Sequence, residues 1–213
     1  MTTLIIFGAT GLVGSQAQAM ALADKRVAQV IAPTRRPLPA HDRLANPPLE
    51  QMLQDPEMGR WRADGAICAL GTTLKQAGSA AAFRAIDHDL VLQVAERCRQ
   101  AGVQRFALVS SLGADPRARF LYPRTKGEVE RAIEKLGFPS LTILRPGFLE
   151  GDRQEQRVME KTMGVLLRVA APILPRSARA SSSAMVARCL VDSAIQQQSG
   201  THIISSEQFA IRK

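Results

Sequence analysis

Short apolar runs alternate along this chain with longer segments in which apolar residues recur every three or four positions. The short runs have the length of buried strands, and the longer segments have the period of helices that pack one face on a sheet. Strand and helix in alternation are typical of βαβ units, whose strands run parallel. The predicted strands are Thr3 to Phe7, Gln29 to Ala32, Leu49 to Leu53, Gly65 to Leu70, Arg105 to Ser110, Leu141 to Leu144 and His202 to Ser205. We therefore predict an α/β fold with a doubly wound parallel sheet of the Rossmann type.

Two helices are the most clearly marked. Apolar residues follow a helical period from Ala80 to Gln100, and again from Pro123 to Leu136, where Gly137 takes the position that commonly ends a helix. The segment Pro33 to Pro48 is rich in proline and polar residues, which favours an exposed connection. Because no repeat or linker divides the chain, residues 1–213 are predicted to form a single domain with a short C-terminal segment on the substrate side.

A glycine-rich turn directly follows the first predicted strand and opens a helical segment. Its residues are Gly8, Ala9, Thr10, Gly11, Leu12, Val13 and Gly14. Glycine is needed where a backbone turns sharply, approaches a pyrophosphate or packs a helix on a strand, and the N–H groups of the helix N-terminus bind the anion. The spacing is GxxGxxG, not the GxGxxG of the usual fingerprint. The order of strand, turn and helix favours a dinucleotide site over the alternative, a tight connection without a ligand.

The residues after the second predicted strand discriminate between the two nicotinamide dinucleotides. An acidic side chain about 20 residues past the last glycine would bind the ribose hydroxyls of NAD. Thr34, Arg35 and Arg36 stand there instead. Guanidinium groups bind phosphate through charge-assisted bidentate hydrogen bonds, which suits the 2'-phosphate of NADPH. The predicted cofactor is NADP(H); the alternative is that both arginines are ordinary surface residues.

The only tyrosine of the chain, Tyr122, stands four residues before Lys126. Carbonyl reduction needs a proton donor, and a phenol, whose reference pKa is about 10, serves near neutral pH when a close ammonium favours the phenolate. Ser110 and Ser111 end a predicted strand at the edge where parallel sheets bind ligands, and their hydroxyls can polarise a carbonyl. These four residues are the predicted catalytic group. The alternatives are strand-end capping for the serines and a packed surface aromatic for Tyr122.

These motifs resemble those of the short-chain dehydrogenase/reductases. The resemblance rests on the glycine turn, the strand-end serines, Tyr122-Pro-Arg-Thr-Lys126 and Leu144-Arg-Pro-Gly-Phe148. Runs similar to the atypical branch related to the human Tat-interacting oxidoreductase are Leu70-Gly-Thr-Thr73, Ser110-Ser-Leu-Gly-Ala-Asp115, Lys126-Gly-Glu-Val-Glu130 and Asp152-Arg-Gln-Glu155. The resemblance covers most of the chain.

The resemblance implies a set of contacts with NADPH. Thr10 to Val13 would hold the pyrophosphate, Arg35 and Arg36 the 2'-phosphate, and Tyr122 and Lys126 would form the catalytic pair beside the cofactor. The further cofactor positions that it implies are Leu70 and Gly71 beyond the fourth strand, Leu149 and Arg157 after the Arg-Pro-Gly turn, and Asp55 at the adenine.

Two departures from the family pattern bear on activity. Pro123 biases Tyr122 away from helical angles, which predicts that Tyr122 is a helix cap. Only about 65 residues follow the Arg-Pro-Gly turn, fewer than the substrate lobe of a nucleotide-sugar epimerase.

Composition narrows the class of partner and compartment. The net charge of +9 suits an anionic partner, but the basic residues are dispersed and aromatic residues make up only 4%, so nucleic acid is not predicted. No stretch reaches the roughly 20 apolar residues of a membrane helix. Three widely spaced cysteines and the lack of a basic leader predict a cytoplasmic protein.

The run Asp87-His88-Asp89 is the one cluster that suggests a metal ion. Consecutive helical residues point in different directions, so the three side chains cannot converge on one ion. We predict a solvated helix face and no metal site.

The leading hypothesis is an NADPH-dependent oxidoreductase that acts on a small carbonyl or alcohol. Its alternatives are a non-catalytic protein that uses bound NADPH as a redox signal and, with less support, a nucleotide-sugar epimerase. The substrate is left open, and so is a protein partner or a homodimer, because fold alone does not specify them.

Overall fold

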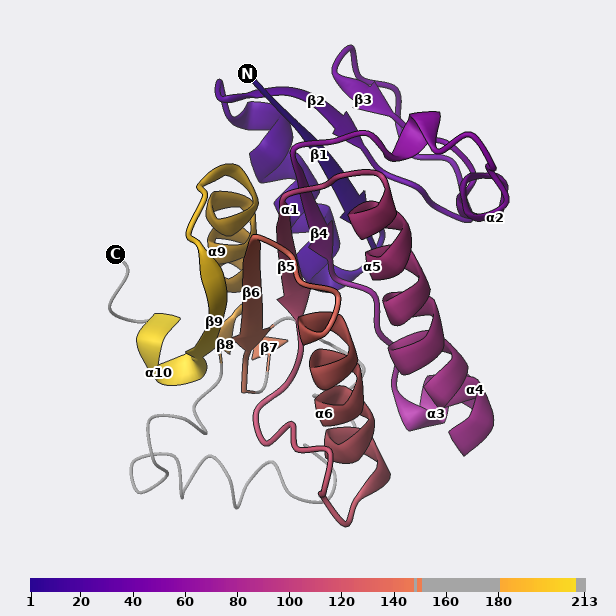
Figure 1. The fold of residues 1–213 in the computed structure, drawn as a ribbon, viewed down its shortest axis with the longest axis vertical. Helices are drawn as coiled ribbons and strands as arrows, with labels where there is room; N and C mark the ends of the chain where they lie inside the picture. Colours follow the sequence, from indigo (N-terminus) through magenta and orange to yellow (C-terminus); the bar gives the residue numbers. More distant parts are fainter. Residues whose placement is uncertain (148, 151–180, 210–213) are drawn as a thin grey trace.

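The computed structural model describes residues 1–147, 149–150 and 181–209 of the chain. The strands of its main sheet are β1 (Thr2–Phe7), β2 (Val27–Ile31), β3 (Leu44–Ala45), β4 (Gly65–Cys68), β5 (Arg105–Val109), β6 (Ser140–Arg145) and β9 (Gly200–Ser205). These seven strands follow the order β3-β2-β1-β4-β5-β6-β9, and every neighbouring pair is parallel (Figure 1). A separate parallel pair joins β7 (Leu149–Glu150) to β8 (Ser181–Ser182). The predicted Rossmann-type α/β fold is confirmed.

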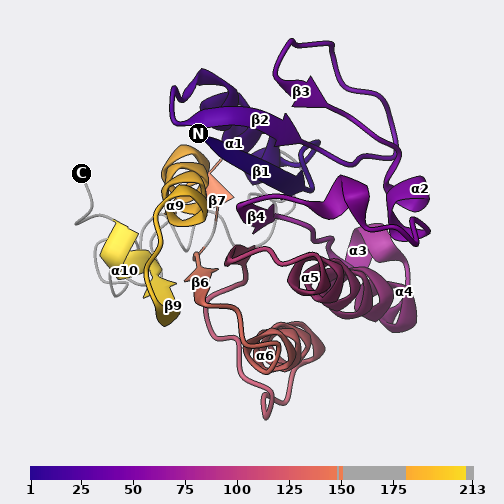
Figure 2. The ribbon, with the colours of Figure 1, turned by 45° about the horizontal axis from the view of Figure 1, so that its top comes forward.

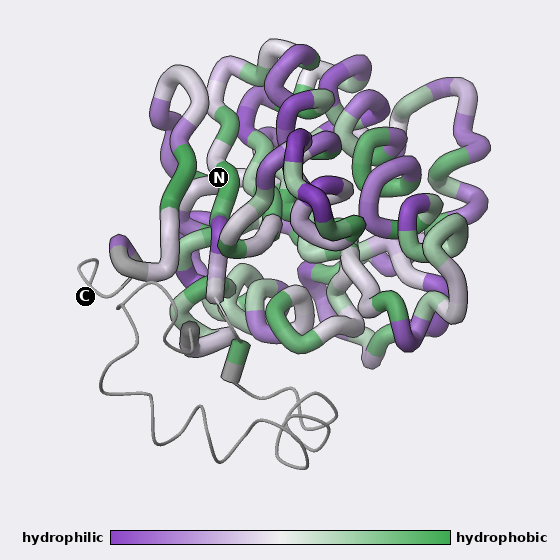
Figure 3. Tube along the Cα trace, turned by 90° about the horizontal axis from the view of Figure 1, so that it is seen from below, coloured by the Kyte–Doolittle hydropathy of each residue, from purple (hydrophilic) through white to green (hydrophobic). Residues whose placement is uncertain are grey.

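Helices cover both faces of the sheet. Their bounds are α1 (Leu12–Ala23), α2 (Leu49–Leu53), η1 (Gly59–Trp61), α3 (Leu74–Ala77), α4 (Ala80–Arg84), η2 (Ala85–Leu90), α5 (Val91–Gln100), α6 (Leu121–Glu134), α9 (Ser183–Ile195) and α10 (Ser206–Phe209). α1 and α9 lie together on one face, and α5 and α6 lie on the other (Figure 2). Hydrophilic and hydrophobic positions alternate along the helical segments, as expected for helices with one face on a sheet (Figure 3).

β1 shows why the central strands read as continuous apolar runs. Leu4 and Ile6 pack into the cluster under α1 and α9, whereas Ile5 and Phe7 pack into the cluster under α5 and α6. All four side chains are fully buried. A strand that is covered on both faces needs apolar residues at every position, not at alternate ones.

Two of the predicted elements around the second strand are wrong. Leu49 to Leu53, predicted as a strand, is the helix α2, which starts after Pro48 and places Leu49, Met52 and Leu53 against the core. The segment contains no β-branched residue, which favours a helix over a strand. The indole N–H of Trp61 fixes this helix by donating to the Met52 carbonyl oxygen at 2.9 Å.

One strand of the main sheet, β3, was not predicted. It lies inside the stretch Pro33 to Pro48, which was predicted as an exposed connection. Asn46 holds this stretch against the sheet, because its side-chain amide donates to the carbonyl oxygen of Ala32 at 2.6 Å and to the hydroxyl of Thr34 at 2.8 Å. A two-residue strand has too few positions to show a period, so its sequence carries no recognisable signal.

Candidate active site

The carboxyl ends of β1, β4 and β5 lead into the segments that carry the predicted site residues. β1 leads into the glycine turn, β4 into Leu70 and Gly71, and β5 into Ser110 and Ser111. β1 lies between β2 and β4 in the sheet. The chain adds strands on the β2 side of β1 first and on the β4 side afterwards. Crevices at such a switch point are where open parallel sheets bind their ligands.

Gly8 and Gly14 make the tight connection between β1 and α1. Gly8 has a φ of +82°, and a Cβ atom there would lie 2.5 Å from the carbonyl oxygen of Ala69. A Cβ atom on Gly14 would lie 2.0 Å from the carbonyl oxygen of Gly8. Both positions therefore exclude any side chain, and Gly14 supplies the close helix–strand packing that the third glycine of a dinucleotide turn provides.

The N-terminus of α1 has the properties of an anion site. Gly11 is its N-cap residue, no side chain caps the helix, and the first turn contains no acidic residue. Thr10 and Gly11 are exposed, Leu12 is half-buried, and the Val13 side chain is buried, so Val13 can contribute only its backbone N–H group. The uncapped N–H groups and the helix dipole fit the pyrophosphate of a dinucleotide.

Arg35 and Arg36 are both exposed beyond the end of β2. The Thr34 hydroxyl shapes their loop by donating to the carbonyl oxygen of Arg36 at 2.6 Å. Neither guanidinium forms a hydrogen bond or an ion pair with another described residue. Both are available to an anionic group of a ligand.

Tyr122 is the second residue of α6, and the cap of this helix is Phe120. Pro123 lies in the first turn, where its missing N–H group removes no helical hydrogen bond. The prediction that Tyr122 is itself a cap is therefore wrong, because the proline is accommodated without moving Tyr122 out of the helix. One turn on, Lys126 lies over the tyrosine ring with its Nζ atom 6.0 Å from the ring centroid.

The tyrosine ring also packs against a second helix. The rings of Tyr122 and Phe83 of α4 have centroids 5.7 Å apart. Tyr122 remains 39% exposed, so its phenol is accessible from solvent.

Lys126 has a partner that the sequence did not suggest. Its Nζ atom lies 2.7 Å from Oδ1 of Asp87, and both side chains are almost completely buried. Asp87 Oδ2 accepts a hydrogen bond from the backbone N–H of Thr72 at 2.8 Å. A Cβ atom on Gly71 would lie 3.4 Å from Asp87 Oδ1 and 3.6 Å from Lys126 Nζ, so the glycine lies directly against the pair.

The prediction of a solvated face at Asp87-His88-Asp89 is wrong for its first residue. Asp87 is four residues from both Phe83 and Val91, which are buried on the core side of the same helical run. Only Asp89, with a 61% exposed side chain, lies in solvent. Among the residues that the structure describes, no group of three or more His, Cys, Asp or Glu side chains is placed to hold a metal ion.

Three buried hydroxyls near the ends of β5 and α6 have no hydrogen-bond partner in the described part of the chain. They belong to Ser110, Ser111 and Thr125, which are 4%, 7% and 1% exposed. The Ser110 N–H group donates to the Leu144 carbonyl oxygen, so the backbone is paired although the hydroxyl is not. Because unpaired buried hydroxyls are costly in a protein interior, these groups fit a site whose ligand completes their hydrogen bonds. Sequence reasoning identified the two serines and missed Thr125 and Asp87.

The remaining predicted contacts are dispersed. Leu70 is half-buried and Gly71 is exposed beyond β4. Leu149 packs in part against the cluster under α1 and α9. Arg157 lies outside the described residues.

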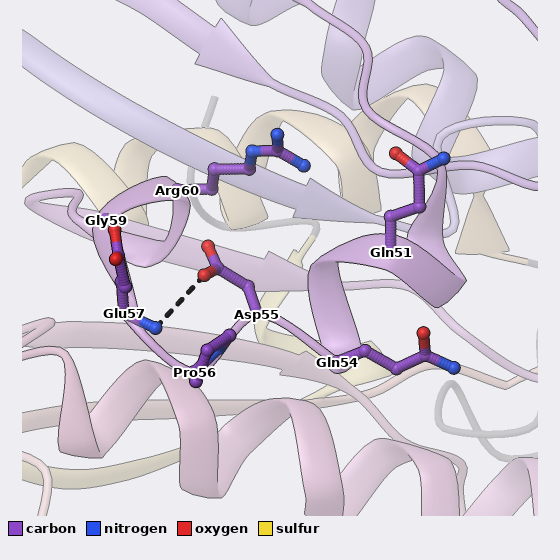
Figure 4. Close-up of a pocket in the computed structure, with 7 residues that line it drawn as sticks. All are labelled: Gln51, Gln54, Asp55, Pro56, Glu57, Gly59 and Arg60. Atoms are coloured by element: carbon purple, nitrogen blue, oxygen red, sulfur yellow. Dashed lines mark hydrogen bonds between the residues drawn. The ribbon is translucent and has the colours of Figure 1, made fainter.

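Asp55 lies on a different surface feature, a pocket of about 450 Å³ whose lining comes entirely from residues 51–60 (Figure 4). Its Oδ1 atom accepts a hydrogen bond from the backbone N–H of Glu57 at 3.1 Å. The glycine turn does not contribute to the lining of this pocket.

The side chains of Cys68, Cys98 and Cys189 are buried. Burial raises the pKa of Cys68, at the end of β4, to about 11, although the nearby charge of Lys126 opposes this effect. The thiol is therefore protonated near neutral pH and is a packing group, not a nucleophile. No helix in the part of the chain that the structure describes is long and apolar enough to cross a membrane.

A family of proteins described as NAD(P)H-binding matches residues 8–197. The chain belongs to this family. The match begins at the first glycine of the turn and includes β2 to β6, Tyr122 and Lys126, whereas β1 and β9 lie outside it. The nicotinamide cofactor expected from the glycine turn is thus supported at the level of NAD(P)H.

Curated relatives carry the name "Protein FMP52, mitochondrial". The one from Coccidioides immitis (strain RS) is 36% identical over 181 residues, which cover 78% of this chain and 73% of the relative. The one from Aspergillus fumigatus is 31% identical over 222 residues, which cover 99% and 94%. These names contradict the prediction of a cytoplasmic protein. Widely spaced cysteines without disulfide spacing are compatible with more than one compartment, so they do not identify the cytoplasm.

Solved structures of similar fold include nucleotide-sugar enzymes. The UDP-Glc/GlcNAc 4-epimerase from Campylobacter jejuni matches with a TM-score of 0.72 at 13% identity and covers 98% of this chain and 82% of its own. MoeE5 in complex with UDP-glucose and NAD matches with a TM-score of 0.71 at 18% identity, with 98% and 79% covered. At such identities the likeness shows the fold alone.

Proposed function

We propose that the chain is an NADPH-dependent oxidoreductase of the short-chain dehydrogenase/reductase type, in the atypical branch, that acts on a small carbonyl or alcohol. The observation that carries the proposal is the pairing on α6: Tyr122 is accessible to solvent, and the buried Lys126 lies one turn away over its ring. Ser110 and Ser111, whose hydroxyls are unpaired, come directly after β5. The carboxyl end of β5 lies at the same edge of the sheet as the glycine turn. These are the groups that carbonyl reduction requires.

Each residue has a role that its chemistry allows. The bound dinucleotide would supply a hydride to the carbonyl carbon. Tyr122 gives a proton to the carbonyl oxygen, and the ammonium of Lys126 stabilises the phenolate that is left. A hydroxyl of Ser111 or Ser110 donates to the same oxygen and orients it. In the oxidation of an alcohol, the same groups act in reverse.

The variant Tyr122→Phe tests the catalytic role. It removes one oxygen atom and keeps the ring that packs on Phe83. We expect NADPH oxidation with a panel of small aldehydes and ketones to fall by about 100-fold or more, because a positioned acid contributes that much, while the affinity for NADPH stays near that of the wild type. Unchanged reduction across the panel would exclude Tyr122 as the acid.

The preference for NADPH over NADH is also a proposal, supported by the exposed and unpaired guanidinium groups of Arg35 and Arg36. Fluorescence titration of Arg35→Ala should show weaker NADPH binding by about tenfold, equivalent to about 1.4 kcal/mol, with little change for NADH. The matched control is Arg131→Ala, which removes an exposed arginine from the last turn of α6. If the wild type bound NADH as tightly as NADPH, and Arg35→Ala changed neither, the 2'-phosphate contact would be refuted.

A non-catalytic NADPH sensor is the second candidate function. The observation in its favour is that the groups assigned to NADPH, the uncapped N-terminus of α1 and the exposed Arg35 and Arg36, do not depend on Tyr122. Such a sensor would bind NADPH with wild-type affinity in the Tyr122→Phe variant and would show no turnover in either form. An epimerase, the function in the names of some structural neighbours, would instead retain its cofactor tightly with no net change of redox state.

A further inference from the structure

Asp87 is completely buried beside the proposed catalytic lysine, yet the roles above leave it unassigned. We propose that Asp87 is a positioning residue, whose carboxylate holds Lys126 Nζ against the Gly71–Thr72 turn before the dinucleotide binds. The inference rests on the proposed function and adds to it the residue through which Lys126 is set in place.

The two oxygens of Asp87 connect two separate parts of the site. Oδ1 lies 2.7 Å from Lys126 Nζ on α6, and Oδ2 accepts from the Thr72 N–H group beyond β4 at 2.8 Å. Gly71, a predicted cofactor contact, precedes Thr72 in this turn. Because it has no Cβ atom, no side chain separates the cofactor side of the turn from the Lys126–Asp87 pair. One carboxylate therefore fixes both the turn that lines the cofactor and the ammonium that faces Tyr122.

Fold stability alone does not account for this arrangement. Asp87 stands on the core-facing side of a helical run whose other buried members include Phe83, Val91 and Cys98. An ion pair in such a place is no more stabilising than well-packed apolar residues of similar volume, because both charges lose their hydration. A buried charge that packing does not require is typical of a functional site.

The local backbone is also unusual. Asp87 lies in η2, a π-helical turn inserted between α4 and α5. Turns of this kind are rare, occur singly within α-helices and are frequent at functional sites.

The lysine side chain explains why a positioning residue is useful. Its ammonium is a point charge on a flexible four-carbon stem, so it has no fixed location of its own. Pairing with a carboxylate on a different helix removes that freedom before the ligand arrives, and a preorganised group loses less entropy on binding.

The test is a double-mutant cycle of Asp87→Asn and Lys126→Met. The variant Asp87→Asn keeps the shape of the side chain and removes its charge. We expect its kcat for carbonyl reduction to fall by about 100-fold, the loss that a misplaced catalytic group causes, with a smaller change in KM for the carbonyl and weaker NADPH binding. In the Lys126→Met background, the same change should alter kcat and the Kd for NADPH by less than about twofold.

The matched control is Glu128→Gln. Glu128 pairs with Arg84, so it links α6 to α4 as Lys126 links α6 to η2, but its pair lies at the surface. Glu128→Gln should leave kcat and NADPH affinity within about twofold of the wild type. Equal effects of Glu128→Gln and Asp87→Asn would overturn the proposal, because they would show a general role in helix packing.

Two further results would also be decisive. If Asp87→Asn weakened kcat or NADPH binding as much in the Lys126→Met background as in the wild type, Asp87 would not act through Lys126. If either single variant fails to fold, the double variant, which leaves no buried charge uncompensated, is compared with the wild type: wild-type kcat and NADPH affinity in the double variant would overturn the proposal. Absence of carbonyl reduction by the wild type would contradict the proposed function, while the Kd for NADPH would still test Asp87.

Discussion

The two sides of the site at the carboxyl edge of the sheet differ in how far their polar groups are buried. On the side of β4, β5 and α6, the groups are desolvated: the Lys126–Asp87 pair and three unpaired hydroxyls are all at least nine-tenths buried. On the side of β1 and β2, the groups are backbone N–H donors at an uncapped helix and two exposed guanidinium groups. The ion pair of the first side forms on folding, whereas its three hydroxyls and the groups of the second side leave their hydrogen bonds to a ligand.

This contrast indicates where a mutation shows its effect. A charge removed from the buried side leaves its partner without compensation, so the free energy of unfolding falls. A charge removed from the exposed side loses little in the free protein, because water replaces the partner, and the effect is seen in binding.

The largest effect is expected for Lys126→Met. It leaves the buried carboxylate of Asp87 uncompensated, so we expect the free energy of unfolding to fall by about 3–5 kcal/mol. The measurement is urea unfolding followed by the fluorescence of Trp61, the single tryptophan of the chain, which is fully buried. The comparison is Arg84→Met, which breaks the surface pair with Glu128 between the same regions and should cost no more than about 1 kcal/mol. Equal losses would mean that the Lys126–Asp87 pair is hydrated like a surface pair.

Gly14→Ala should have the next largest effect, on the opposite side of the edge. The new methyl group would meet the Gly8 carbonyl oxygen at 2.0 Å, so helix and turn must separate. We expect a loss of about 1–3 kcal/mol in the free energy of unfolding, as for other overpacked positions, together with loss of measurable NADPH binding. The matched change is Gly59→Ala, where no atom lies within 4 Å of the new methyl group and stability should be nearly unchanged. Retention of NADPH affinity in Gly14→Ala would separate the turn from the cofactor site.

The parts of the fold that the sequence predicted are those with local causes. The turn at Gly8 to Gly14 follows from steric demands within seven residues, and β1 follows from a strand that is covered on both faces. β3 could not be predicted in the same way, since the hydrogen bonds that hold it come from the side chain of Asn46, which a local period does not encode. For α2 the local signal, a lack of β-branched residues, was present, and the contact with Trp61 that fixes the helix was not predictable from it.

Asp87 was missed for a different reason, although the sequence contains a signal. The spacing Phe83, Asp87, Val91 places an acid on the apolar side of a helix, which is an unfavourable position unless a cation is buried with it. Lys126, the eventual partner, is 39 positions away, and nothing in the chain before folding indicates that α6 will pack against this turn. The interpretation of the acidic run as a solvated face followed from its charge, whereas its position on the helix indicated the opposite.

The smallest effect is expected at the other edge of the sheet, where Asp24 and Arg26 follow α1. The Arg26 guanidinium donates to Asp24 and holds the pKa of that carboxyl below its ordinary value of 3.8. A carboxyl with a lowered pKa stabilises the folded chain above its unfolded pKa, and this contribution disappears as the pH falls through the folded value. Because the Arg26 side chain is 48% exposed, solvent screening limits the contribution to about 0.5 kcal/mol. Between about pH 6 and pH 3, the wild type should therefore lose slightly more unfolding free energy than Asp24→Asn, a difference that about 1 M salt should remove. If this difference in unfolding free energy were as large as the loss expected for Lys126→Met, side-chain exposure would not explain why buried and exposed charges differ in this protein.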